Sequence, residues 1–182
     1  SPPCRCGATA RAWRLTAERS GFGVTLLDPL CRRASGTPFA TIMIPRSDRA
    51  AALRVLLDTC TVIFTAQDPT RLSKTARDLL VDPNSVVFAS VVTAGELACL
   101  TERKRIVLPK HWKTWFRDCV ERNGWNLLPL TIEIMEEAYS LPDPIHRDPV
   151  DRILIATSRL EDMTIMTTDR LILGYPHVKS RA

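Results

Sequence analysis

From residue 53 to residue 167, short apolar runs alternate with amphipathic stretches. Each run is short, mostly apolar and bounded by polar or turn residues, which is typical of buried strands. The runs predict strands at 53–57, 85–89, 126–130 and 163–167. Apolar side chains at helical spacing predict helices at 61–65, 73–80, 90–101, 110–122, 131–140 and 149–160. Strands that alternate with helices indicate a parallel sheet with helices on both faces.

Residues 1–50 lack this pattern. Glycine and proline recur through them, and only a short helix at 10–19 and a strand at 41–44 are indicated. We expect a largely disordered, basic N-terminal extension, or a segment that results from a mis-assigned translation start. The predicted organisation is therefore this extension at 1–50 and one α/β domain at 51–182, a parallel β-sheet flanked by helices.

The net charge of +5 is carried by the N-terminal extension. Residues 1–50 contain 8 Arg and 3 acidic residues, whereas residues 51–182 contain 17 Lys and Arg and 17 Asp and Glu. The overall charge of the domain therefore gives no argument for nucleic-acid binding, which would need a local patch or a metal ion. The basic run Arg103-Lys104-Arg105 is either a solvated connector or such a phosphate contact.

Other features bound the class of protein. No apolar run reaches the ~18–20 residues that span a bilayer, and the N-terminus lacks the apolar core of a signal peptide. We therefore expect a soluble, cytoplasmic protein without membrane contact. Its six cysteines contain no C-x-x-C pair and are expected to be reduced. The stripe Trp112, Trp115 and Phe116 is more typical of a core or dimer contact than of an RNA-stacking surface.

The string His146-Arg147-Asp148-Pro149-Val150-Asp151-Arg152 predicts the start of a helix. Pro149 suits the first helical position, where its missing N–H needs no partner. Asp148 is then the expected N-cap, because a residue before proline is kept out of the α region. Asp151 falls in the first turn. Both aspartates have a structural explanation, since acidic residues stabilise a helix N-terminus.

Acidic residues also stand near the carboxyl ends of the predicted strands. Asp58 directly follows the first strand, Asp169 follows the last, and Glu96 lies in the helix after the second strand. Open parallel sheets place their sites at this edge, so with Asp151 these four residues are expected at one pole. Each has its own structural alternative; Thr93 to Glu96, for example, fits a capping box. Residues that only cap helices, however, have no reason to gather at one pole of the sheet.

Four neighbouring carboxylates repel one another and stay ionised only around a cation. Hard oxygen ligands without paired His or Cys favour Mg²⁺, with Mn²⁺ as the alternative. Such an ion orients a water molecule, lowers its pKa and stabilises the charge of a phosphodiester transition state. The pattern therefore indicates metal-dependent hydrolysis of phosphodiester bonds.

Residues 55–175 resemble the PIN-domain ribonucleases, specifically VapC-type toxins of type II toxin–antitoxin pairs. The most specific piece is the His146–Arg152 string. The other matching pieces are Leu56-Leu57-Asp58-Thr59, Ser90 through Ala98, Leu141-Pro142, Ile155-Ala156-Thr157, Met166-Thr167-Thr168-Asp169 and Tyr175-Pro176.

The resemblance implies a PIN-like three-layer sandwich and RNA cleavage, often of tRNA or rRNA. It further implies a homodimer and inhibition by a cognate antitoxin. The implied metal-binding and catalytic quartet is Asp58, Glu96, Asp151 and Asp169, with Mg²⁺ as the cofactor and Mn²⁺ as a substitute. Thr167 is implied as the catalytic hydroxyl that accompanies the last aspartate.

The sequence departs from this family pattern at three places. Cys60 stands where His is common, Gly95 where a large aromatic residue is common, and Lys104-Arg105 replaces a glycine-containing turn. None of these removes a carboxylate. Two alternatives stay open. One is a catalytically silent PIN-fold module that binds RNA or an antitoxin. The other is a haloacid-dehalogenase-like phosphatase, which needs a second Asp where Cys60 stands.

Overall fold

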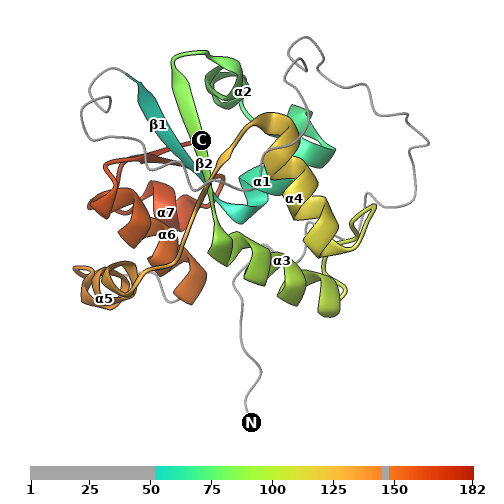
Figure 1. Cartoon of the computed structure of the whole chain (residues 1–182). Coiled ribbons are helices and arrows are strands. Elements are labelled where there is room, and N and C mark those ends of the chain that lie inside the picture. Colours follow the sequence, from blue (N-terminus) through green and yellow to red (C-terminus); the bar gives the residue numbers. More distant parts are fainter. Residues whose placement is uncertain (1–51, 145–147) are drawn as a thin grey trace.

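The computed structural model describes residues 52–144 and 148–182 (Figure 1). Some of the sequence predictions lie outside these residues. They are the N-terminal extension, the helix at 10–19, the strand at 41–44 and the His146-Arg147 part of the helix-start string.

The described part of the chain is built around a five-stranded, entirely parallel sheet in the order β3-β2-β1-β4-β5. The strands are β1 (Leu53–Leu57), β2 (Ser85–Ser90), β3 (Asn126–Leu128), β4 (Thr164–Met166) and β5 (Ser180–Arg181). The four predicted strands are confirmed, and β3 lies at an edge as Pro129 predicts. The two-residue β5 was not predicted, because only its pairing with β4 defines it.

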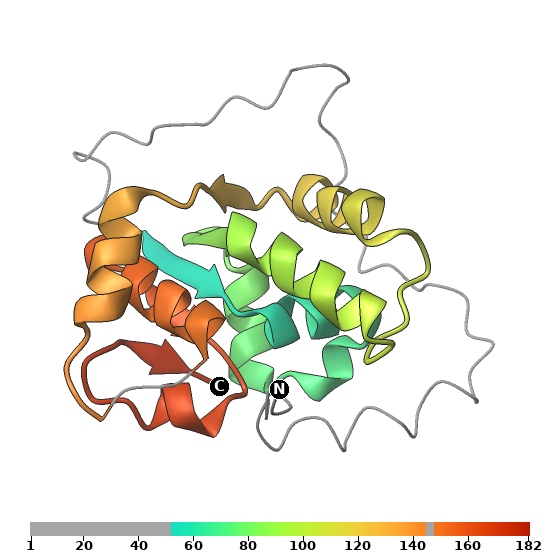
Figure 2. The ribbon, with the colours of Figure 1, turned by 90° about the horizontal axis from the view of Figure 1, so that it is seen from below.

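Helices cover the sheet on both faces, so the predicted α/β three-layer fold is confirmed. They are α1 (Thr59–Gln67), α2 (Lys74–Val81), α3 (Val91–Glu102), α4 (Trp112–Asn123), α5 (Ile132–Ser140), α6 (Pro149–Leu160) and α7 (Arg170–Leu173), with a 3-10 turn, η3, at Pro69–Arg71. Viewed from below, α3 lies beside α4, and α5 beside α6 (Figure 2). Within the described residues, no helix is long and apolar enough to cross a membrane.

The helix boundaries follow from local capping. Asp58 caps α1, which therefore begins two residues earlier than predicted. Gly124 ends α4 in the left-handed conformation, with φ 64°. The capping box at Thr93 to Glu96, the structural alternative for Glu96, is not formed. The N-cap of α3 is Ser90, whose hydroxyl accepts the Val92 N–H at 3.3 Å, because β2 runs directly into the helix. Thr93 is buried inside that helix.

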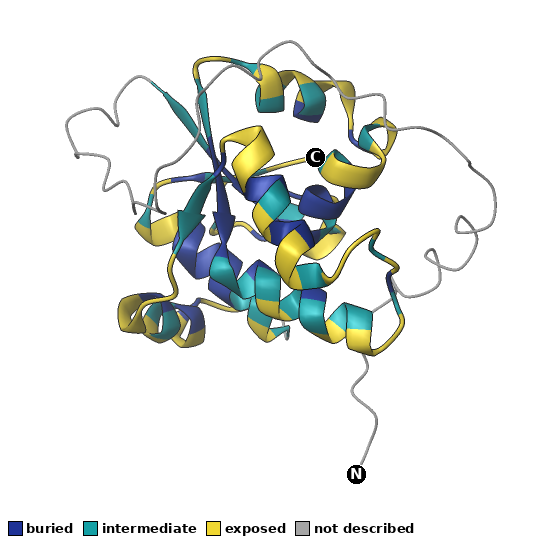
Figure 3. Ribbon diagram, turned by 45° about the vertical axis from the view of Figure 1, so that its right-hand side comes forward, coloured by how far each residue is buried: buried dark blue, intermediate teal, exposed yellow. Residues whose placement is uncertain are grey.

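The core has two main clusters because successive strand residues point to opposite faces of the sheet. Val55 and Leu57 pack with α1, α3 and α4, whereas Leu56 packs with α6 and with Ile165 of β4. Figure 3 shows the buried residues along the sheet and the inner sides of the helices. Trp115 and Phe116 are each 5% exposed, which confirms their interpretation as core side chains. They are therefore not available for stacking on bases.

Candidate active site

Asp58 is a buried carboxylate at the carboxyl end of β1, with 5% of its surface exposed. Its Oδ1 accepts the Thr61 N–H at 2.6 Å, and its Oδ2 accepts the hydroxyl of Thr167. The Asp58 backbone N–H donates to the Met166 carbonyl at 3.2 Å. Because Met166 and Thr167 lie at the end of β4, Asp58 links the ends of two adjacent strands.

Burial raises the pKa of Asp58 from 3.8 to about 6. Its hydrogen bonds with Thr167 and Thr61 oppose this rise, and the nearby negative charge of Asp151 adds to it. The carboxylate has lost its hydration, and the protein supplies hydrogen bonds but no neutralising charge sufficient to restore the ordinary pKa.

Glu96 lies on α3, and its Oε2 accepts the hydroxyl of Thr59 at 2.5 Å. Burial raises the pKa of Glu96 from 4.5 to about 7, and the charges of Asp151, Asp148 and Asp58 raise it further. Thr59 directly follows Asp58, so one dipeptide supports both carboxylates. Nothing in the sequence pattern indicates this role for Thr59, although it is part of the matching string after β1.

Asp148 and Asp151 occupy the start of α6 as predicted. Asp148 is the N-cap, with φ −72° and ψ 125°, and its Oδ1 accepts the Val150 N–H at 2.9 Å. Pro149 takes the first helical position. Asp151 is half-buried in the first turn, and its charge raises the pKa of both Asp58 and Glu96. Asp151 therefore lies close to both of these residues.

Thr167 connects Asp58 to the last predicted site residue. It is completely buried, and its hydroxyl donates to Asp58 while accepting the Asp169 N–H at 2.9 Å. Asp169 is half-buried and caps α7, because its Oδ1 accepts the Leu171 N–H at 2.7 Å. The short α7 thus holds Asp169 next to the end of β4.

The half-buried Cys60 lies among all four predicted acidic residues. Burial strongly raises the pKa of its thiol, and the charges of the quartet raise it further: Asp58, Glu96, Asp151 and Asp169. The thiol therefore stays protonated at neutral pH without a metal ion. All four carboxylates therefore lie near Cys60, at one pole of the sheet, as the strand topology predicts.

The chemistry of this group of oxygen atoms suits a hard divalent cation, which would counter the raised pKa values of Asp58 and Glu96. In the side-chain positions of residues 52–144 and 148–182, however, no three His, Cys, Asp or Glu residues are gathered closely enough to hold one ion together. The four carboxylates share one region without forming a closed coordination shell.

Comparison with known proteins identifies the fold family. The family model of the PIN domain matches residues 55–175. Among curated proteins, none matches the chain.

Two solved structures are similar to the chain. One is VapBC2 from Rickettsia felis bound to a DNA fragment from its promoter, with a TM-score of 0.54, 10% identity, and coverage of 71% of this chain and 98% of that chain. The other is VapBC-1 from nontypeable Haemophilus influenzae, with a TM-score of 0.50, 14% identity, and coverage of 71% and 97%. At this identity they show a shared fold. With its parallel sheet, its four acidic residues at one pole and the match over residues 55–175, the chain belongs to the PIN-domain family.

Proposed function

We propose that the protein is a metal-dependent endoribonuclease toxin of the VapC type, which hydrolyses RNA phosphodiester bonds. The observation that carries the proposal is the position of Asp58. It is buried at the carboxyl end of β1, hydrogen-bonded by Thr167 and close to the charges of Asp151 and Glu96. A fold that only needed a helix cap at Asp58 would not need further carboxylates around it.

The cofactor we propose is Mg²⁺, with Mn²⁺ as a substitute. PIN-domain nucleases generally use divalent metals, and in this chain Asp58, Glu96, Asp151 and Asp169 would hold the ion. When bound, such an ion lowers the pKa of a water molecule and stabilises charge on the phosphate.

The chain's own residues prepare this site. Thr167 fixes Asp58, Thr59 fixes Glu96, and the Asp148 cap fixes the first turn of α6 that carries Asp151. Held in this way, Glu96 and Asp169 are placed to orient the attacking water. Positioning of this kind favours catalysis.

The proposed partners follow from the family resemblance and from the VapBC neighbours. We expect a cognate antitoxin that inhibits the enzyme, an RNA substrate of the tRNA or rRNA class, a homodimer and a cytoplasmic location. The similarity in fold to the two VapBC structures supports the antitoxin.

Cleavage of total RNA in Mg²⁺, with the cut ends mapped, tests the function. We expect defined cleavage by the wild-type chain, none in EDTA and none with Asp58→Ala or Asp151→Ala. Asp162→Asn, an exposed carboxylate outside the site, is the control and should cleave normally. Thermal melting of each variant checks its folding. Cleavage by Asp58→Ala at the wild-type rate would show the proposal to be wrong.

A catalytically silent PIN-fold module that binds RNA or an antitoxin is the second candidate. The absence of three gathered metal ligands among the described residues favours it. Calorimetric titration with Mn²⁺ separates the two candidate functions. The proposed nuclease gives a heat of Mn²⁺ binding that depends on Asp151, whereas a silent module that binds no metal gives none. The phosphatase alternative gains no support, because the protonated Cys60 thiol stands where its second Asp is needed.

A further inference from the structure

A strongly cationic segment joins α3 to α4. Residues 103–117 contain six Lys and Arg and no Asp or Glu. Residues 51–182 nevertheless contain equal numbers, 17 of each sign. The domain is therefore neutral overall but polarised, because the balancing negative charges lie elsewhere, in part at the acidic site.

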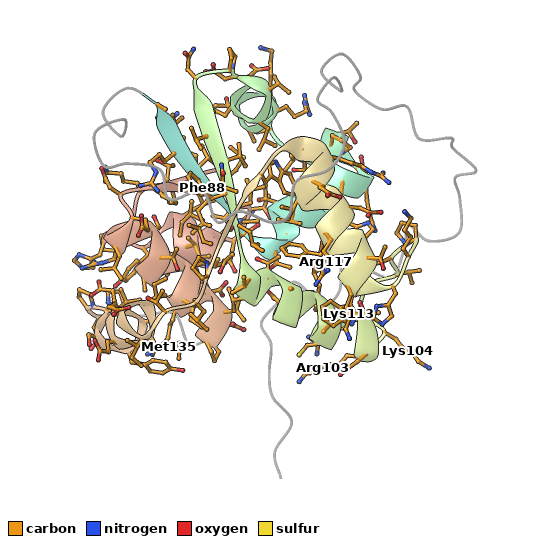
Figure 4. The ribbon with its side chains drawn as sticks, viewed as in Figure 1. Phe88, Arg103, Lys104, Lys113, Arg117 and Met135 are labelled. Atoms are coloured by element: carbon orange, nitrogen blue, oxygen red, sulfur yellow. The ribbon has the colours of Figure 1, made fainter. Side chains whose placement is uncertain are left out.

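Five of these cations are exposed, and one of them, Lys110, pairs with Asp118. The other four are Arg103, Lys104, Lys113 and Arg117. They form what we call the α3–α4 basic patch, and Figure 4 shows them on one side of the molecule, at the end of α3 and along α4. Lys113 and Arg117 are one turn apart on the same face of α4 and line a shallow hollow of about 520 Å³. Gathered like charges repel one another, so the patch favours an anionic partner.

Two acidic residues, Asp118 and Glu121, also line that hollow, and the charge of Asp118 is already compensated. The Asp118 carboxylate pairs with Lys110 at 2.6 Å and with Arg122 at 3.4 Å. The printed ion pairs of Asp118 are therefore made with cations other than Lys113 and Arg117.

The turn that carries Arg103 and Lys104 is well ordered. The Arg103 N–H bonds to the Cys99 carbonyl at 3.0 Å, and the Lys104 N–H to the Thr101 carbonyl at 2.9 Å. Lys104 has a φ of 52°, in the left-handed region that ordinary side chains rarely adopt. Both cations are thus presented from a fixed turn rather than from a flexible tail.

The patch is aligned with the acidic site along α3. Arg103 follows Glu96 by seven residues, which is about two helical turns and about 10 Å. Residues at this spacing share one face of a helix. An RNA strand that crosses Glu96 and follows α3 therefore reaches Arg103 after about three nucleotides at the 3.4 Å spacing of stacked bases.

We propose that the α3–α4 basic patch binds the phosphates of the RNA strand on one side of the bond that is cut. The inference rests on the proposed ribonuclease function and adds the surface that holds the substrate. Patch residues bind and position the RNA without touching the reacting atoms. The alignment of the patch with the acidic site along α3 favours RNA over an acidic protein, because a strand held at the site can reach these phosphate contacts.

A matched pair of charge variants tests the patch. The patch variant is R103Q/K104N/K113Q, in which Asn suits the left-handed position of Lys104. Arg117 is kept because it makes other contacts. The control K74Q/K179Q/R181Q removes three exposed charges outside the patch. Binding of a labelled single-stranded RNA of about 16 nucleotides is measured by fluorescence anisotropy in EDTA, so no cleavage is needed.

We expect the patch variant to bind RNA at least about tenfold more weakly than the wild type in ~0.15 M salt. Its salt slope should fall by about 2, because each lost phosphate contact contributes about 0.7 in a single strand. The control variant should keep wild-type affinity. Unchanged affinity and slope in the patch variant, or an equal loss in the control, would overturn the proposal. Equally tight, patch-dependent binding of poly-glutamate would reassign the surface to an acidic protein.

The outcome is separable from that of the proposed function. In Mg²⁺ the patch variant should cut RNA with a raised KM and an unchanged kcat, because the acidic residues are untouched. Patch-dependent binding without any cleavage in Mg²⁺ would contradict the proposed nuclease function and support the RNA-binding surface. Normal cleavage together with patch-independent binding would contradict the RNA-binding surface and support the nuclease function.

Discussion

The hydroxyl of Thr59 donates to Oε2 of Glu96 at 2.5 Å, across 37 residues of sequence. Thr59 is buried at the first position of α1, directly after Asp58. The same turn that carries one carboxylate of the site therefore holds the second, so the distance between β1 and α3 is fixed by a side-chain contact at the site itself.

Replacing Thr59 by Ala should weaken cleavage about tenfold while the domain still folds. The Thr59 bond lowers the pKa of Glu96, so its loss should raise that pKa further and shift the acidic limb of the pH–rate profile to higher pH. Thr59→Ser keeps the hydroxyl and should restore both rate and profile. Equal profiles for the Ala and Ser variants would contradict the positioning role.

Thr167→Val should destabilise the domain by about 1–3 kcal/mol, since it leaves an Asp58 oxygen and the Asp169 N–H without their partner. Denaturant unfolding measures this change. Thr167→Ser should lose much less, because it keeps the hydroxyl. A Val variant as stable as the wild type would show that the two hydrogen bonds contribute nothing net.

Asp58→Asn should stabilise the metal-free domain at neutral pH and abolish cleavage. Folding raises the pKa of Asp58 from 3.8 to about 6, so between these values the folded state binds more protons than the unfolded state. Stability therefore falls as the pH rises through this window, by about 3 kcal/mol in all for this group. The raised pKa of Glu96 continues the fall to about pH 7.

The melting temperature measured from pH 4 to pH 8 in EDTA checks this. Wild-type protein should melt at lower temperature as the pH rises, and Asp58→Asn should show a shallower decline. Added Mg²⁺ should raise the melting temperature at pH 8 and have little effect at pH 5, where Asp58 and Glu96 are protonated. A Mg²⁺ effect of the same size at both pH values would argue against binding by these carboxylates.

Asp148→Asn should cleave RNA far better than Asp151→Asn. Asn is as good an N-cap as Asp, so the start of α6 should be kept, whereas Asp151→Asn removes a proposed metal ligand. Asp148→Ala, which loses the cap, should cost about 1 kcal/mol of stability. Single-turnover cleavage rates give the comparison, and equal losses in the two Asn variants would contradict the division between cap and ligand.

Gly95→Ala should stabilise the domain by about 1 kcal/mol, because Ala is the better helix former. A Cβ at Gly95 meets no heavy atom within 4 Å, so nothing opposes the substitution. Thermal unfolding measures the gain. Destabilisation would show that the space beside Glu96 is needed by the folded chain itself.

The sequence by itself determined most of the elements and the local geometry of α6. Apolar periodicity indicates the strands and helices, and the Asp148-Pro149 pair defines the helix start, because both depend on neighbouring residues alone. It missed α7 and β5, since such short elements are selected by tertiary contacts.

The tertiary structure decided which site residues contact one another. The strand order brings β4 beside β1, so Thr167 reaches Asp58 across 109 residues. No periodicity encodes the Thr59–Glu96 bond either, because it depends on how α3 packs beside the start of α1. Local patterns specify elements through short-range propensity, whereas the raised pKa values of Asp58 and Glu96 arise from burial that exists only once the layers are assembled.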